Sequence, residues 1–173
     1  MSDALTDRIV DLLPRLRRFA LTLTRHKDDA DDLVQATVER ALARLGSWKE
    51  DSRLDSWMFK IMQNHWIDQT RARRTRGPQD TDYDLASTPG ADGRDVMESR
   101  LTLRATLDAA MALPEEQRSV LMLVVVEGLS YRDAADILAV PVGTVMSRLS
   151  RARLALEGRV LDDGVPGPSE ARQ

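Results

Sequence analysis

The sequence lacks the residues on which several classes of protein chemistry depend. It has no cysteine, which excludes disulfide bonds, thiolate nucleophiles and cysteine-ligated zinc or iron–sulfur sites. Its two histidines, His26 and His65, have no second ligand or nucleophile at a spacing typical of an active site. We therefore expect no enzyme activity, no metal and no cofactor.

Long apolar segments are also missing. No stretch approaches the run of about 18 apolar residues that a membrane-spanning helix needs. The N-terminal sequence MSDALTDRIVDLL has acidic residues where a secretory signal has basic ones. These features predict a cytoplasmic protein that does not insert into the membrane.

The residues that are present are typical of a globular protein, but their charges are divided along the chain. Hydrophobic residues make up 42% and charged residues 31% of the sequence, with a net charge of −3. Residues 1–77 carry 15 Lys or Arg against 12 Asp or Glu, whereas residues 78–97 carry one Arg against five Asp. Local clusters of charge therefore indicate partners better than the overall charge does.

Proline and glycine divide the sequence into segments. Pro78–Asp95 contains two prolines, two glycines and five aspartates, a composition that cannot bury enough apolar surface to offset the entropy of ordering. Outside it, apolar residues recur at helical rather than strand spacing. We predict an all-α fold with two small helical domains, residues 1–77 and 96–160, a flexible acidic linker over 78–95 and a disordered tail over 161–173.

Helix signals place the elements within these domains. Ser52 and Asp55 stand at the spacing of a capping box, and so do Ser130 and Asp133. Pro114 fits the start of one helix and Gly128 its end. A short break over residues 139–143 then separates two helices, which predicts a helix-turn-helix in the second domain.

The last predicted helix has one apolar and one cationic face. Residues 141–156 include three arginines and no acidic residue. Its spacing predicts a packed stripe of Val145, Met146, Leu149, Ala152 and Leu156, and an outward stripe of Thr144, Arg148 and Arg151. A solvated charged face is the alternative, but a helix-turn-helix places this second helix in the major groove of DNA.

The first domain has a second nucleic-acid signal. Trp48, Trp57, Phe59, His65 and Trp66 lie within 19 positions, just before the arginines at 71, 73, 74 and 76. Aromatic rings beside positive charge suit unstacked bases. Core packing is the alternative, which we accept for Trp57, whereas for Trp48 both interpretations stay open.

Four consecutive segments resemble one family. DADDLVQATVERAL, SWMFKIMQNHWIDQTRARR, LPEEQRSVLMLVVVEGLSYRDAADIL and VPVGTVMSRLSRARLAL are similar to the hallmark segments of sigma-70 factors of the extracytoplasmic-function (ECF) group. The resemblance covers about residues 8 to 158. It implies that the first domain binds the clamp of the largest subunit of core RNA polymerase and melts the minus-10 promoter element. The second domain would bind the flap of the next subunit and read the minus-35 element.

The resemblance also implies roles for individual residues. The polymerase-binding surface would comprise Asp31, Asp32, Leu33, Gln35 and Glu39. The minus-10 element would contact Trp48, Lys60, Asn64, Arg71, Arg73 and Arg74, with Trp48 and Asn64 as walls of a pocket for a flipped base. The minus-35 element would contact Thr144, Ser147, Arg148, Arg151 and Arg153.

Two alternatives to a promoter-specific sigma factor remain. A sigma mimic would sequester an anti-sigma factor without binding DNA, but it would have no use for the arginines at 71–76 or for the cationic last helix. A helix-turn-helix repressor would leave the first domain unexplained. The family resemblance further implies an anti-sigma factor as partner and a stress or envelope-response regulon.

Overall fold

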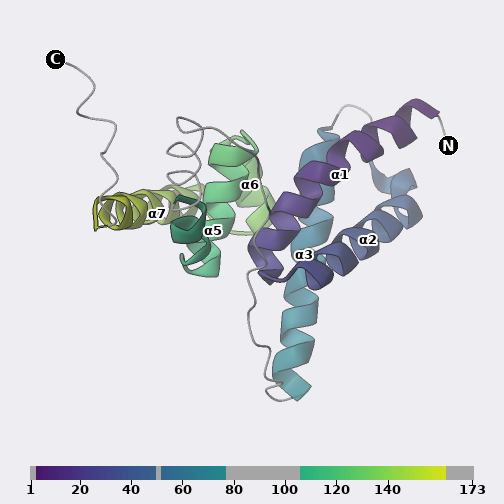
Figure 1. Cartoon of the computed structure of the whole chain (residues 1–173). Coiled ribbons are helices and arrows are strands. Elements are labelled where there is room, and N and C mark those ends of the chain that lie inside the picture. Colours follow the sequence, from purple (N-terminus) through teal and green to yellow (C-terminus); the bar gives the residue numbers. More distant parts are fainter. Residues whose placement is uncertain (1–2, 50–51, 77–105, 163–173) are drawn as a thin grey trace, which may run out of the picture.

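The fold is all-α, as the sequence predicts (Figure 1). The computed structural model describes residues 3–49, 52–76 and 106–162, and within these ranges it contains no strand. The predicted linker over 78–95 lies outside the described residues, as does the predicted tail from residue 163 on. The N-terminal helices are α1 (Asp3–Thr24), α2 (Lys27–Ala43), the short 3₁₀ helix η1 (Leu45–Ser47) and α3 (Leu54–Arg76). The C-terminal helices are residues 106–111, α5 (Glu115–Leu121), the π-helix η2 (Met122–Val126), α6 (Tyr131–Leu138) and α7 (Val142–Asp162).

The N-terminal helices pack through the apolar stripes that their spacing predicts. On α1, Leu16, Phe19 and Leu23 are buried, and they share a core with residues of α2 and α3. The rings of Phe19 and Phe59 meet edge to face with centroids 5.4 Å apart. This core fixes the face that α3 leaves exposed.

The start of α3 differs from the predicted capping box. The Ser52 hydroxyl donates to the Lys49 carbonyl instead of capping the helix. The Asp55 carboxylate accepts from the backbone N–H of Ser56 and from the side chain of Arg53. The spacing of Ser52 and Asp55 could not predict these hydrogen bonds, because the contacts of Asp55 depend on which arginines lie near it in the folded chain.

The C-terminal helices contain the predicted helix-turn-helix. Gly128 has a positive φ of 67°, which glycine adopts without strain and which redirects the chain after η2. Ser130 caps α6 by accepting from the backbone N–H of Asp133 at 3.0 Å. Ala139 ends α6 in the left-handed region with φ 53°, and α7 starts at Val142. α7 runs to Asp162, two residues beyond the predicted end of the second domain at residue 160.

The two groups of helices pack against each other. α3 contacts α6, and α1 contacts α5. Figure 1 shows α5, α6 and α7 to one side of α1 and α3, with α2 on the other side. One continuous cluster of buried apolar residues includes members of both groups, from Ile9 on α1 to Leu149 on α7.

Candidate nucleic-acid interface

α3 presents its predicted DNA contacts on the face that the core leaves open. Lys60, Asn64, Arg71, Arg73 and Arg74 are all exposed. Within the described residues, only Arg73 of these five forms an ion pair, with Asp29 of α2, and its 3.9 Å separation makes it weak. The described part of α3 therefore offers an amide and several cations to an incoming ligand.

The aromatic cluster is mostly core. Phe59, His65 and Trp66 are buried, so these three rings are not open stacking platforms and that part of the prediction is wrong. Burial, together with the nearby charge of Arg40, lowers the pKa of His65 despite the opposing effect of Asp68, so its imidazole is uncharged at neutral pH.

Trp48 is packed rather than free. Its ring centroid lies 6.5 Å from that of Trp57, and the Arg8 guanidinium lies over the Trp48 ring, 5.3 Å from its centroid. Its indole N–H is buried without a hydrogen-bond partner among the described residues. Asn64, the other predicted wall of the base pocket, lies about two turns after Trp57 on α3. Trp48 therefore contributes to the packing before α3, and its predicted base contact stays a prediction.

α7 turns a slightly different face outward than the sequence predicts. Val145, Leu149 and Ala152 are buried as predicted, but Met146 is 53% exposed. Arg148 takes the inner position instead. Its side chain is 19% exposed and pairs with Glu116 of α5 at 2.8 Å. The prediction that Arg148 points freely outward is therefore wrong, because position 148 lies on the same face as Val145 and Ala152.

The other predicted minus-35 contacts of α7 remain accessible. Ser147, Arg151 and Arg153 are exposed and Thr144 is half-buried. The Ser147 hydroxyl donates to the Thr144 carbonyl at 3.1 Å, within the helix. α7 thus presents two free guanidinium groups and two hydroxyls on its described outer surface.

The predicted polymerase-binding residues on α2 separate into a surface and a support. Asp31, Asp32, Gln35 and Glu39 are exposed, whereas Leu33 is 1% exposed and belongs to the core. Leu33 therefore cannot be part of the contact surface in this conformation. Arg17 of α1 pairs with Asp31 at 2.8 Å, and Gln35 donates to Glu39 at 3.0 Å.

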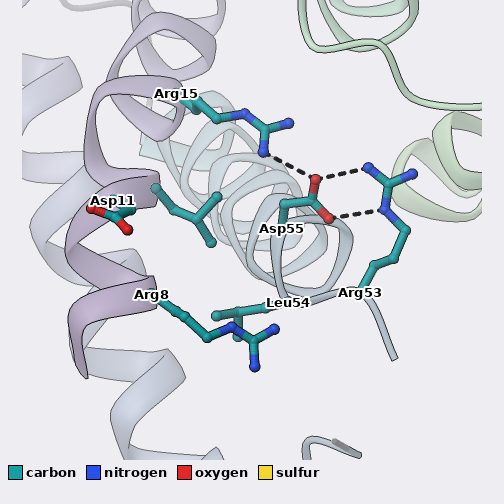
Figure 2. A pocket seen from close by; sticks show the side chains of 7 residues that line it. Arg8, Asp11, Arg15, Arg53, Leu54 and Asp55 are labelled. Atoms are coloured by element: carbon teal, nitrogen blue, oxygen red, sulfur yellow. Dashed lines mark hydrogen bonds and ion pairs between the residues drawn. The ribbon is translucent and has the colours of Figure 1, made fainter. Parts of the chain in front are cut away.

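A pocket of about 330 Å³ opens beside the start of α3 (Figure 2). Figure 2 shows Arg15 and Arg53 converging on the Asp55 carboxylate from opposite sides. Burial by itself would raise the pKa of Asp55, but hydrogen bonds from Arg53, the Ser56 N–H and Arg15 outweigh it and lower the pKa from 3.8 to about 2. This carboxylate is therefore ionised at any physiological pH.

The ion pairs around Asp55 continue into the C-terminal helices. Arg15 Nε donates to Glu127 at 2.6 Å, and Arg18 donates to the other oxygen of Glu127 at 3.0 Å. Arg53 pairs with Asp133 at 3.6 Å. We call the six residues Arg15, Arg18, Arg53, Asp55, Glu127 and Asp133 the interface network. Sequence reasoning missed it, because no local pattern connects residues that lie up to 112 positions apart.

A buried arginine makes a separate contact between the two groups of helices. Arg118 of α5 is 4% exposed. Its Nε donates to the Thr22 carbonyl at 2.6 Å, and its Nη1 donates to the Leu113 carbonyl at 2.7 Å. The last turn of α1 contains no basic residue, so Arg118 supplies the cation that favours a helix C-terminus.

Other kinds of site are not evident in the described ranges. Among the residues that the structure covers, no three His, Asp or Glu side chains gather closely enough to hold a metal ion. No helix within the described ranges is long and apolar enough to cross a membrane.

The all-α fold, the cationic helix-turn-helix and the exposed arginines of α3 are typical of a helix-turn-helix DNA-binding protein. Two family descriptions match the sequence: "Sigma-70, region 4" over residues 103–156 and "Sigma2 domain of PhyR" over residues 9–63. The ECF RNA polymerase sigma factor EcfG of Rhodopseudomonas palustris is 40% identical, over 98% of this chain and 93% of that protein. The ECF RNA polymerase sigma factor SigM of Mycobacterium tuberculosis is 33% identical, over 82% of this chain and 69% of that protein.

A solved structure agrees with these relatives. The sigma factor RpoE of Bartonella quintana, in complex with the anti-sigma factor NepR, superimposes with a TM-score of 0.79 and 32% identity. The match covers 94% of this chain and 99% of that one. The chain belongs to the sigma-70 family, in its ECF group, and the family consists of transcription initiation factors rather than enzymes.

Proposed function

We propose that this chain directs core RNA polymerase to promoters by contacting the minus-10 element with α3 and the minus-35 element with α7. The observation that supports this most is the exposure of basic side chains on the open faces of both helices. In this proposal the chain acts in the cytoplasm, where the polymerase is, and has no active site of its own.

At the minus-10 element, Asn64 is the residue that we expect to contact a base. One amide group both donates and accepts, which suits the edge of an unpaired base. Lys60 lies one turn earlier on the same exposed side, while Arg71, Arg73 and Arg74 extend the cationic surface along α3. We assign these four to the DNA backbone, because such contacts need charge rather than a fixed edge.

At the minus-35 element, Arg151 and Arg153 are the guanidinium groups available to bases or phosphates. Thr144 and Ser147 lie nearer the start of α7, the end that enters the groove in helix-turn-helix proteins. Arg148 must exchange Glu116 for DNA if it is to take part. We therefore rank Arg151 above Arg148 as a base contact.

The acidic face of α2 is the surface that we assign to the polymerase clamp. Asp31, Asp32, Gln35 and Glu39 are exposed there, and Leu33 beneath them anchors the helix in the core. Partners with a basic surface fit this face by charge complementarity.

We also propose regulation by an anti-sigma factor and a role in a stress or envelope response. The support is the similar RpoE of Bartonella quintana, whose structure is a complex with the anti-sigma factor NepR. The alternative function, a sigma mimic, has support of its own, because residues 9–63 match the Sigma2 domain of PhyR. The exposed cations of α3 and α7 favour the sigma factor, since a mimic does not contact phosphates.

Run-off transcription with purified core polymerase, on the promoter upstream of the chain's own operon, tests the proposal. Asn64→Ala should reduce open-complex formation, and a template with a pre-melted bubble should restore much of it by removing the cost of unpairing. Thr75→Ala, another exposed polar residue of α3, is the control and should behave as wild type. Failure to support transcription from any promoter, with tight binding to an anti-sigma factor, would identify a mimic instead.

A further inference from the structure

The outer face of α7 carries apolar side chains that the core does not use. Met146 is 53% exposed, and Val142, one turn before it, is 41% exposed. The core takes Val145, Leu149 and Ala152 from the same helix instead. A single exposed apolar residue needs no explanation. Two of them on one ridge of the helix that we assign to the minus-35 element indicate a contact with an apolar part of the ligand.

Met146 lies in the half of α7 that we expect to enter the DNA groove. α7 begins at Val142, so Met146 is in its second turn. In helix-turn-helix proteins, residues near the start of the second helix contact the edges of bases in the major groove. Ser147, the next residue, is exposed too, and it is one of the residues that we assign to the minus-35 element. Met146 therefore stands beside an assigned DNA contact.

The charges around Met146 favour nucleic acid as its ligand. Residues 141–156 contain three arginines and no acidic residue. Arg151 and Arg153 are exposed, and neither forms an ion pair with another described residue. A duplex brings phosphates to such cations while it brings base edges to the side chains between them. The apolar side chain is thus set in a surface whose charge is complementary to DNA.

Thymine carries the apolar group that suits this methionine. Guanine, adenine and cytosine present hydrogen-bond donors and acceptors in the major groove, whereas thymine also presents its C5 methyl group. The methionine thioether cannot donate a hydrogen bond and accepts one only weakly, so it has little to offer the polar base edges. Its unbranched, flexible and polarisable side chain suits contact with a methyl group.

We propose that Met146 is a specificity-determining residue of α7, which recognises a thymine of the minus-35 element through van der Waals contact with its C5 methyl group. The inference rests on the proposed function, because it assumes that α7 enters the major groove at that element. Arg151 acts through charge, which salt screens. Met146 adds discrimination that does not depend on charge.

An open hollow beside Met146 defines the alternative ligand, an apolar segment of a protein. The hollow has a volume of about 300 Å³, and its lining includes Met146 and Leu154 of α7 and Tyr131 of α6. A protein segment that filled it would contact both Met146 and Leu154. A thymine methyl group would contact Met146 alone, because the eight residues between the two positions span about 12 Å of helix. Variants of Met146 and Leu154 therefore distinguish the two ligands.

Removal of single methyl groups from the DNA tests the contact. Deoxyuridine pairs with adenine as thymine does and lacks only the C5 methyl group. Core RNA polymerase reconstituted with the full chain is titrated with the promoter upstream of the chain's own operon, in which each thymine of either strand of the minus-35 element is replaced in turn. At one position the replacement should weaken wild-type binding about three- to fivefold, which is the effect of burying one methyl group.

Variants of the chain complete the test. Met146→Ala should weaken binding to the unmodified promoter by a similar factor, and it should no longer respond to deoxyuridine at that position. Met146→Leu keeps an apolar side chain of similar size and should retain the response. Leu154→Ala is the matched change at another exposed position of α7 and should behave as wild type. Both residues are more than half exposed, so the alanine variants should fold normally.

The results that would overturn the role of Met146 are distinct from failure of the proposed function. A response to deoxyuridine that persists in Met146→Ala, a wild-type chain that responds at no thymine, or a minus-35 element without an A·T pair would each overturn it. Equal losses for Met146→Ala and Leu154→Ala on every template would overturn it too and assign the hollow to a protein. If the wild-type holoenzyme bound matched and scrambled minus-35 sequences equally, the proposed function itself would fail, and this inference with it.

Discussion

The arginines of the outer surface and those of the interface between the helix groups show how one residue type serves two purposes. On the outer surface, Arg71 and Arg151 are exposed, and neither forms an ion pair with another described residue. At the interface, Arg15 and Arg118 are held by carboxylates and carbonyls. A guanidinium that already has its acceptors cannot take a phosphate without giving them up.

The same comparison explains why charge alone did not identify the DNA contacts. Arg148 shares features of both sets of arginines, since it belongs to the cationic helix α7 and yet pairs with Glu116. Exposure and pairing therefore separate the arginines that are free to bind DNA from those that hold the fold together.

The largest expected effect comes from removing the buried arginine of the interface. Arg118→Met should lower the free energy of unfolding by about 2 to 4 kcal/mol, because it leaves the buried Thr22 and Leu113 carbonyls without a donor. Urea unfolding followed by circular dichroism measures this. Arg151→Met, the matched change on the outer surface, should alter the free energy of unfolding by less than about 0.5 kcal/mol. Similar losses for both variants would erase the distinction between the two regions.

The next effect concerns DNA discrimination by α7. Arg151→Ala should cost about 1 to 3 kcal/mol of preference for a matched minus-35 sequence over a scrambled one. Arg148→Ala should cost less of that preference and more stability, because Glu116 and the inner face of α7 hold its side chain. Binding of each variant to matched and scrambled duplexes at one salt concentration measures the difference. The reverse ranking would show that Arg148 leaves Glu116 to read DNA.

These two arginines also mark where prediction from the sequence stops. The stripes of α1 and α3 were predictable, because their apolar residues recur at helical spacing and all of them pack. On α7, Met146 and Arg148 both lie near the edge of the stripe, and residue type favoured burying the methionine. The fold buries the long arginine stem instead and leaves Met146 exposed, because α5 presents Glu116 on that side.

The interface contacts could not be predicted for a different reason. Glu127 pairs with Arg15 and Arg18 of α1, which lie 112 and 109 positions away. Arg118 bonds to Thr22 of α1, which lies 96 positions away. No spacing rule reaches across that separation, and charged residues in a sequence are usually solvated. The helix-turn-helix, by contrast, was predictable from Gly128 and from the Ser130 and Asp133 cap, since those signals are local.

Acid should weaken the interface through Asp55. The folded-state pKa of Asp55 is lowered to about 2 from its ordinary 3.8, so its contribution is complete above pH 4 and is lost as the pH falls from about 4 to about 2. The shift corresponds to about 2 kcal/mol at most. Wild type and Asp55→Asn should therefore differ by up to that amount in free energy of unfolding at pH 6. Their difference should vanish near pH 2, and a difference independent of pH would contradict the pairing with Arg15 and Arg53.

The smallest expected effect is on the outer surface, at the ion pair between Arg17 and Asp31. Both side chains are nearly half exposed, so Arg17→Gln should change the free energy of unfolding by less than about 1 kcal/mol. It should nevertheless strengthen binding to core polymerase slightly at low salt, because it frees one carboxylate on the acidic face that we assign to the clamp. Titration of labelled protein against core polymerase at two salt concentrations measures this. Asp31→Asn should weaken the same binding, and if both variants bound like wild type, Asp31 would not belong to the polymerase-binding surface.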